Sequence, residues 1–154
     1  MTRSQLLRLG LFQMAAGGLS VLFLGVLNRV MRVELGLDLV VVGLLVGAGH
    51  YLGALVAIPF GHFSDRHSIR GYRRTFYIAI GVALTGLILM LSPWVVRWLA
   101  LSPTTLNVSA AFIFFLLEGV ATFVAGTAYL SLIASRTTSK ERGPATGLVW
   151  TLMM

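Results

Sequence analysis

Long apolar runs alternate with short charged gaps along this chain. No Asp, Glu, Lys or Arg occurs from Leu9 to Asn28, from Leu39 to Ser64, or from Thr75 to Val96. A fourth run extends from Trp98 to Ser135 and is interrupted only by Glu118. Because a helix crosses the hydrocarbon core of a bilayer in about 20 residues, this pattern predicts four complete transmembrane helices.

The predicted helices occupy approximately residues 10–31, 39–61, 75–97 and 107–134. A fifth apolar run, 143–154, follows. Its twelve residues, at about 1.5 Å each, reach roughly 18 Å, whereas the core of a bilayer is about 30 Å thick. We therefore expect the fifth helix to be incomplete, and residues 1–154 to form a partial N-terminal transmembrane bundle of a longer all-α membrane protein.

Composition supports lipid as the solvent for most of this chain. Hydrophobic residues make up 57% of it and charged residues 11%, whereas a soluble domain carries about 25% charged residues. The net charge is +7, but the basic residues are confined to the gaps between apolar runs, a distribution that argues against nucleic acid as a partner. Since there is no cysteine, disulfides and thiolate metal sites are excluded.

The basic residues predict an orientation in the membrane. Nine of them fall before the first helix, between the second and third, and after the fourth: Arg3, Arg8, Arg66, Arg70, Arg73, Arg74, Arg136, Lys140 and Arg142. The opposite side receives Arg29, Arg32 and Arg97. Cytoplasmic loops carry the excess of Lys and Arg, so we expect the N-terminus to lie in the cytoplasm and membrane lipids to be direct partners.

Small residues recur at steps of four in the second predicted helix, at Gly49, Gly53, Ala57 and Gly61. Such a stripe lets two helix backbones approach closely within lipid. Close helix packing is the simplest interpretation of the stripe. A pigment ring or a lipid tail lying against this face is the sharper alternative.

The gap between the second and third helices has a characteristic order of residues. It contains Gly61, Asp65, Arg66, Arg70, Gly71, Arg73 and Arg74. The glycine lets two helices meet tightly, and the aspartate can pair with an arginine or a helix N-terminus. The last two arginines could hold anionic headgroups or acidic side chains, although an ordinary positive-inside loop would contain the same charges.

This order, Gly-x-x-x-Asp-Arg followed by Gly-x-Arg-Arg, resembles the signature loop of the major facilitator superfamily. The segment 67–70 lengthens the loop, and this longer form resembles the bacteriochlorophyll-delivery branch, with its PucC-like and LhaA-like members. Three further regions are similar to that branch: residues 8–13, residues 27–31 with 33–36, and residues 128–132 together with 142–143 and 149–151. The resemblance implies a major-facilitator-type helical bundle with about twelve spans.

The resemblance also implies a function. Members of this branch are implicated in assembling light-harvesting or photosystem complexes, by delivering or inserting chlorophyll or bacteriochlorophyll, in a bacterial inner or thylakoid membrane. The subunits and pigments of these photosynthetic complexes would be the partners, and a carotenoid or lipid could also bind. Related sequences are described as folate or pterin transporters, which leaves transport as an alternative. A structural membrane subunit bound to a photosynthetic complex is a third.

Two ionisable residues fall near the middle of predicted helices, His50 in the second and Glu118 in the fourth. Such residues are costly in lipid and are candidates for function. Glu118 could be a proton-coupling carboxylate of a transporter, and His50 could be an axial ligand to chlorophyll magnesium. Each could instead make one interhelical hydrogen bond, or the two could pair with one another.

Four other polar residues are candidates for contact with a pigment or substrate. Gln13 and Asn28 lie near the two ends of the first helix, where a hydrogen bond to a neighbouring helix is the simpler interpretation. Thr122 follows Glu118 by four residues and Tyr129 lies further along the same helix, so both could line a cavity. We expect no enzyme, because the chain has no phosphate-cradling glycine loop with lysine and no Ser-His-Asp set.

Overall fold

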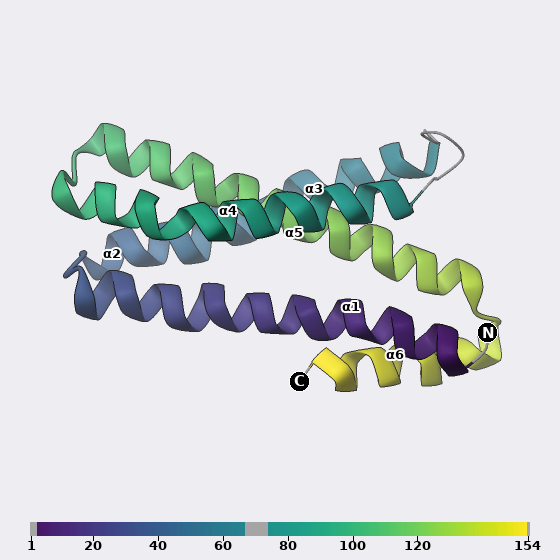
Figure 1. The fold of residues 1–154 in the computed structure, drawn as a ribbon. Helices are drawn as coiled ribbons and strands as arrows, with labels where there is room; N and C mark the ends of the chain where they lie inside the picture. Colours follow the sequence, from purple (N-terminus) through teal and green to yellow (C-terminus); the bar gives the residue numbers. More distant parts are fainter. Residues whose placement is uncertain (1–2, 67–73, 154) are drawn as a thin grey trace.

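The computed structural model describes residues 3–66 and 74–153, and within these ranges the regular structure is helical throughout. Four helices among them are long and apolar enough to cross a membrane: Gly10–Glu34, Leu39–Phe60, Thr75–Leu101 and Thr105–Arg136. The prediction of an all-α membrane protein fragment is therefore confirmed. In Figure 1 these long helices run side by side, with the shorter last helix next to the first.

The first long helix combines α1 (Arg3–Val21) with two π-helical segments, η1 (Leu22–Leu27) and η2 (Val30–Glu34). The second combines α2 (Leu39–Val42), the π-helical η3 (Gly43–Gly49) and α3 (His50–Arg66). A π-helical turn contains more residues than an α-helical turn, so each segment rotates the residues that follow it around the helix axis. Segments of this kind occur frequently at functional sites.

A tight turn joins the first two long helices. Gly36 has φ +65°, in the left-handed region that glycine enters without steric cost. The Asp38 carboxylate then accepts a hydrogen bond of 2.7 Å from the backbone N–H of Val40 and caps α2. The Arg32 side chain donates to the carbonyl of Leu37 at 3.0 Å and closes the turn from the other side.

The third and fourth long helices are α4 (Thr75–Leu101) and α5 (Thr105–Arg136), and the last helix is α6 (Ser139–Met153). Helix α4 continues past the predicted end at residue 97, because Leu99 is fully buried there while Arg97 is exposed. Helix α6 begins before the predicted start at residue 143. The side chain of Glu141 accepts hydrogen bonds from the backbone N–H and hydroxyl of Thr138 and stabilises this earlier start.

Helix α5 is the centre of the packing. It lies against both α3 and α4, whereas α1 packs mainly against α6. Two apolar clusters occur along α5. One contains Phe115 together with Phe23 and Leu99, and the other contains Tyr129 with Val149 of α6. Glu118 and Thr122 lie between these clusters on α5, so polar side chains are enclosed by apolar packing on both sides along the helix.

Candidate functional site

His50 of α3 and Glu118 of α5 form a buried pair. The Nδ1 atom of His50 lies 2.5 Å from Oε2 of Glu118. The residues are only 8% and 2% exposed, respectively. The sequence left open whether these two ionisable residues would meet, and the structure pairs them directly. Two polar groups that would each be costly in lipid therefore satisfy one another.

Glycines bring the two backbones together at this pair. A Cβ atom added to Gly119 would collide with the backbone of His50, and one added to Gly53 would collide with the backbone of Gly119 and Val120. A Cβ on Gly49 would lie 3.3 Å from the Cβ of Phe115. The prediction that the small-residue stripe packs helices is confirmed for Gly49 and Gly53.

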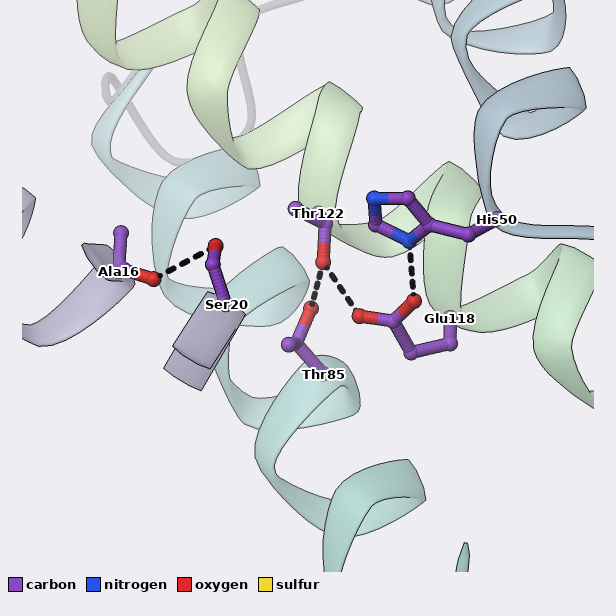
Figure 2. Close-up of polar contacts among 6 residues, drawn as sticks. All are labelled: Ala16, Ser20, His50, Thr85, Glu118 and Thr122. Atoms are coloured by element: carbon purple, nitrogen blue, oxygen red, sulfur yellow. Dashed lines mark hydrogen bonds and ion pairs between the residues drawn. The ribbon is translucent and has the colours of Figure 1, made fainter. Parts of the chain in front are cut away.

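Two threonines extend the polar contacts to α4. The hydroxyl of Thr122 donates to Oε1 of Glu118 at 2.8 Å, one turn along the same helix. The hydroxyls of Thr85 and Thr122 lie 3.0 Å apart, and because Thr122 donates to the carboxylate, Thr85 is the donor to Thr122. Figure 2 shows this chain of contacts from α4 through α5 to His50. Both carboxylate oxygens of Glu118 therefore have partners.

Aromatic side chains surround the imidazole of His50. The ring centroids of Phe23, Tyr51 and Phe123 lie 5.0, 5.1 and 5.2 Å from it. These residues come from η1, α3 and α5, so three separate segments contribute to the cluster. The imidazole is held between aromatic faces and a carboxylate, in a largely apolar environment.

A cavity of about 460 Å³ lies beside this pair. Its lining includes Gln13, Ala16, Ser20 and Phe23 from the first long helix, His50 and Tyr51 from α3, Thr85 from α4, Glu118, Thr122, Phe123 and Gly126 from α5, and Trp150 from α6. The volume is within the range of about 300–1,000 Å³ that is usual for sites of small molecules. Such sites combine apolar walls with a few polar groups, as this lining does.

The second nitrogen of His50, Nε2, is not enclosed by the packing, and His50 belongs to the lining of the cavity. Nε2 makes no hydrogen bond within residues 3–66 and 74–153. In the same residues, every side-chain nitrogen or oxygen atom that is fully buried has a hydrogen-bond partner, so Nε2 is not one of the fully buried atoms. The hydroxyl of Ser20, in contrast, donates to the carbonyl of Ala16 in its own helix at 3.0 Å (Figure 2).

The candidate residues from the sequence fall into two groups. His50, Glu118, Thr122 and Gln13 all line the cavity. Asn28 is exposed and lies outside this lining. Tyr129 also lies outside it, because its ring packs against Phe12, with centroids 4.4 Å apart, in the apolar cluster near α6. Whether any of these residues binds a pigment or substrate stays a prediction.

Sequence reasoning missed Thr85 and the aromatic residues around His50. Thr85 follows Gly81 by four residues, and a Cβ on Gly81 would lie 2.7 Å from the Cβ of Ala125. The spacing thus placed Thr85 on the face of α4 that packs against α5. A single threonine is a weak signal, because its hydroxyl can bond to a carbonyl of its own helix instead.

The signature loop is described only at its edges. Gly61, Asp65 and Arg66 belong to the end of α3, while Arg70, Gly71 and Arg73 lie outside the described residues. Arg74 donates from Nη1 to the carbonyl of Ser131 in α5 at 2.7 Å. This arginine therefore ties the start of α4 to the end of α5.

Comparison with known proteins assigns the family. A family described as "PUCC protein" matches residues 26–154 of this chain. The chain belongs to the PUCC protein family. Its four span-length helices and this membership identify an integral membrane protein. No solved structure matches it.

Three curated relatives align with nearly the whole chain. It is 36% identical to "Bacteriochlorophyll synthase 44.5 kDa chain" of Rhodobacter capsulatus, over 97% of this chain and 34% of the relative. It is 31% identical to "Protein PucC" of Rhodovulum sulfidophilum, over 98% and 35%. It is 35% identical to "Uncharacterized protein in puhA-bchM intergenic region" of Rhodobacter capsulatus, over 97% and 32%. The chain thus spans about a third of the length of these relatives.

Proposed function

We propose that this chain is part of a membrane factor that assembles light-harvesting or photosystem complexes by delivering or inserting chlorophyll or bacteriochlorophyll. Membership of the PUCC protein family supports this proposal, as does the similarity to a relative named for bacteriochlorophyll synthase. The role is non-enzymatic in our proposal. Its partners would be pigments, membrane lipids and subunits of the photosynthetic complex.

The observation that carries the proposal is the cavity between the first long helix and α3–α5, with the imidazole of His50 in its lining and in an aromatic surrounding. Apolar and aromatic walls suit the ring of a pigment, and they would equally accept part of a carotenoid or a lipid tail. His50, Phe23 and Phe123 would contact such a ring. Bound pigment would supply light absorption, and the chain would supply a protected site during transfer.

We further propose that the helices form the N-terminal part of a major-facilitator-type bundle in a bacterial inner or thylakoid membrane, with the N-terminus in the cytoplasm. The arrangement of basic residues around the spans supports this orientation. Fusing a reporter that is active on only one side of the membrane to residue 104, between α4 and α5, tests it. Activity on the cytoplasmic side would contradict the orientation.

The test of the pigment proposal is purification of the full-length protein in mild detergent from a pigmented host, followed by a visible absorption spectrum and identification of accompanying proteins. We expect stoichiometric chlorophyll or bacteriochlorophyll together with antenna or photosystem subunits. Subunits without pigment would favour a structural role instead. Absence of both would contradict the proposal.

The buried carboxylate of Glu118 favours one alternative, a proton-coupled transporter of a small solute such as a pterin. A carboxylate beside a cavity is a suitable group for coupling proton movement to solute binding. Proteoliposomes containing the full-length protein decide this. Saturable pterin uptake driven by a proton gradient and lost in Glu118→Gln would favour transport over pigment handling.

A further inference from the structure

The imidazole of His50 is held by a carboxylate at Nδ1, whereas its other nitrogen, Nε2, makes no hydrogen bond to any residue that the structure describes. Its Nδ1 atom contacts Oε2 of Glu118 at 2.5 Å, and an ionised carboxylate can only accept. With Glu118 ionised, the imidazole donates from Nδ1, in the tautomer that leaves Nε2 without a proton. In that tautomer Nε2 carries a lone pair, and Nε2 is the ring nitrogen without a hydrogen bond among the described residues, in a residue that lines the cavity.

A histidine with this hydrogen-bonding arrangement resembles a histidine that binds a metal ion. Histidines that bind metals usually donate the other ring N–H to a carboxylate or carbonyl, which fixes the ring and raises the basicity of the ligating nitrogen. Glu118 is itself fixed, because Thr122 donates to its Oε1 atom at 2.8 Å. Thr85 lies 3.0 Å from Thr122 and supports that hydroxyl in turn.

The cavity does not provide the ligands that a free metal ion would need. The described residues contain no group of three or more His, Cys, Asp or Glu side chains that could hold one. A metal ion that His50 ligates must therefore arrive with most of its coordination positions already filled. Metal ions at the centre of planar macrocycles meet this condition, since four ring nitrogens surround them and one axial position needs a ligand.

The walls beside His50 match a flat apolar ligand of this kind. Phe23 and Phe123 place their ring centroids 5.0 and 5.2 Å from that of His50, and neither brings a charge to the cavity. Aromatic rings in offset or tilted contact stabilise one another beyond the burial of their area. A macrocycle ligated by Nε2 would find such rings next to its metal.

We propose that Nε2 of His50 is the single protein ligand to the central metal of a planar tetrapyrrole, and that Glu118 is the residue that positions this imidazole. The inference rests on the proposed function, which it makes specific: the cavity distinguishes a metallated macrocycle from its metal-free form. The chemistry requires only a neutral imidazole and an open axial position on the metal.

Binding of two probes to the full-length protein in detergent tests the inference. The probes are bacteriochlorophyll a, which contains magnesium, and bacteriopheophytin a, which has the same ring without it. We expect wild type to prefer the metallated probe by at least about tenfold, or about 1.4 kcal/mol. His50→Ala should abolish this preference, so that the two probes bind with similar affinity. Added imidazole should restore the preference in His50→Ala, because it can occupy the vacated position.

Two further variants separate ligation from general packing. Glu118→Gln keeps a carbonyl that can accept from Nδ1–H. It should therefore weaken binding of the metallated probe by about 10- to 100-fold. The bound bacteriochlorophyll should still show the shift of its absorption band that ligation of its metal causes. Ser92→Ala removes a buried hydroxyl that donates to the carbonyl of Leu89 in its own helix, outside the cavity lining, and should retain the full preference.

Each outcome decides between the two proposals. If wild type binds both probes equally, or if His50→Ala keeps the preference, the ligation inference is wrong while pigment binding stands. If wild type binds neither probe, pigment handling by this cavity is contradicted as well. Should His50→Ala fail to fold, the preference of wild type and the absorption shift in Glu118→Gln still test ligation.

Discussion

The Nδ1 atom of His50 lies 2.5 Å from Oε2 of Glu118, across an interface where α3 and α5 touch backbone to backbone. The close approach depends on Gly53 and Gly119, where any Cβ would collide with the opposite helix. The pair therefore belongs both to the packing of the bundle and to the wall of the cavity. Its two roles can be separated by measuring stability and ligand binding in the same variants.

Removal of one member of the pair should destabilise the protein. Glu118→Leu leaves the buried Nδ1–H of His50 without its acceptor, and we expect a loss of about 1–3 kcal/mol in the free energy of unfolding. His50→Leu should have a similar effect. The double variant should be less destabilised than the sum of the two by about 1 kcal/mol, measured by denaturant unfolding in detergent. Additive effects would contradict a direct interaction.

Adding a methyl group at Gly119 should separate α3 from α5. Gly119→Ala places a Cβ against the backbone of His50, and we expect a loss of about 1–3 kcal/mol, the usual cost of overpacking. Gly126→Ala is the matched control on the same helix, because no atom lies within 4 Å of the added Cβ. Equal melting temperatures for the two variants would show that the helices do not touch at Gly119.

The sequence predicted the spans well because they depend on the length of uncharged runs, which is a local property. It also singled out His50 and Glu118, since an ionisable residue in such a run is conspicuous. Their pairing could not be predicted, because 68 residues separate them and the rotation of each helix about its axis decides which side chains meet. The π-helical segment η3 immediately precedes His50 and changes that rotation.

The position of Tyr129 shows the same limit. Counting along α5 from Glu118 placed it near the face of the cavity, but the packing of α6 directs its ring toward Phe12 and Val149. Thr85 was missed for the opposite reason, because a threonine in an apolar run does not require a polar partner outside its own helix. Contacts between helices decided the positions of both Tyr129 and Thr85, and the pattern of residues along the chain does not reveal these contacts.

The threonine contacts of Glu118 should differ in importance. Thr122→Val removes the donor to Oε1 and also the acceptor for Thr85, so we expect a loss of about 1–3 kcal/mol in stability. Thr85→Val removes only the outer hydroxyl and should cost about 0.5–1.5 kcal/mol. Thermal unfolding monitored by circular dichroism measures both. A larger effect at Thr85 would contradict the order of donors that we assign.

The start of α6 should weaken in acid. The backbone N–H of Thr138 and then its hydroxyl donate to Glu141 and hold the pKa of this carboxyl below its ordinary value of 4.5. A lowered pKa means that the stabilisation is present above pH 4.5 and is lost as the pH falls through the folded pKa. The protection factors of the amides at residues 139–142, which correct for the intrinsic exchange rate at each pH, should therefore fall in that range.

Glu141→Gln provides the control for this effect, because its amide does not titrate. We expect the protection factors at the start of α6 to be lower than in wild type at neutral pH and not to fall further in acid. The same pH dependence in wild type and Glu141→Gln would assign the effect to another group.

Filling the cavity tests the central claim most directly. Gly126 lines the cavity and has open space where a Cβ would lie, so Gly126→Phe should insert a ring into the cavity without disturbing the contact of α3 with α5. The measurement is an equilibrium titration of the full-length protein with bacteriochlorophyll a, followed by absorption. We predict saturable binding to wild type and a loss of at least about tenfold in Gly126→Phe with an unchanged melting temperature. Undiminished binding to a folded Gly126→Phe would contradict the assignment of the pigment to this cavity.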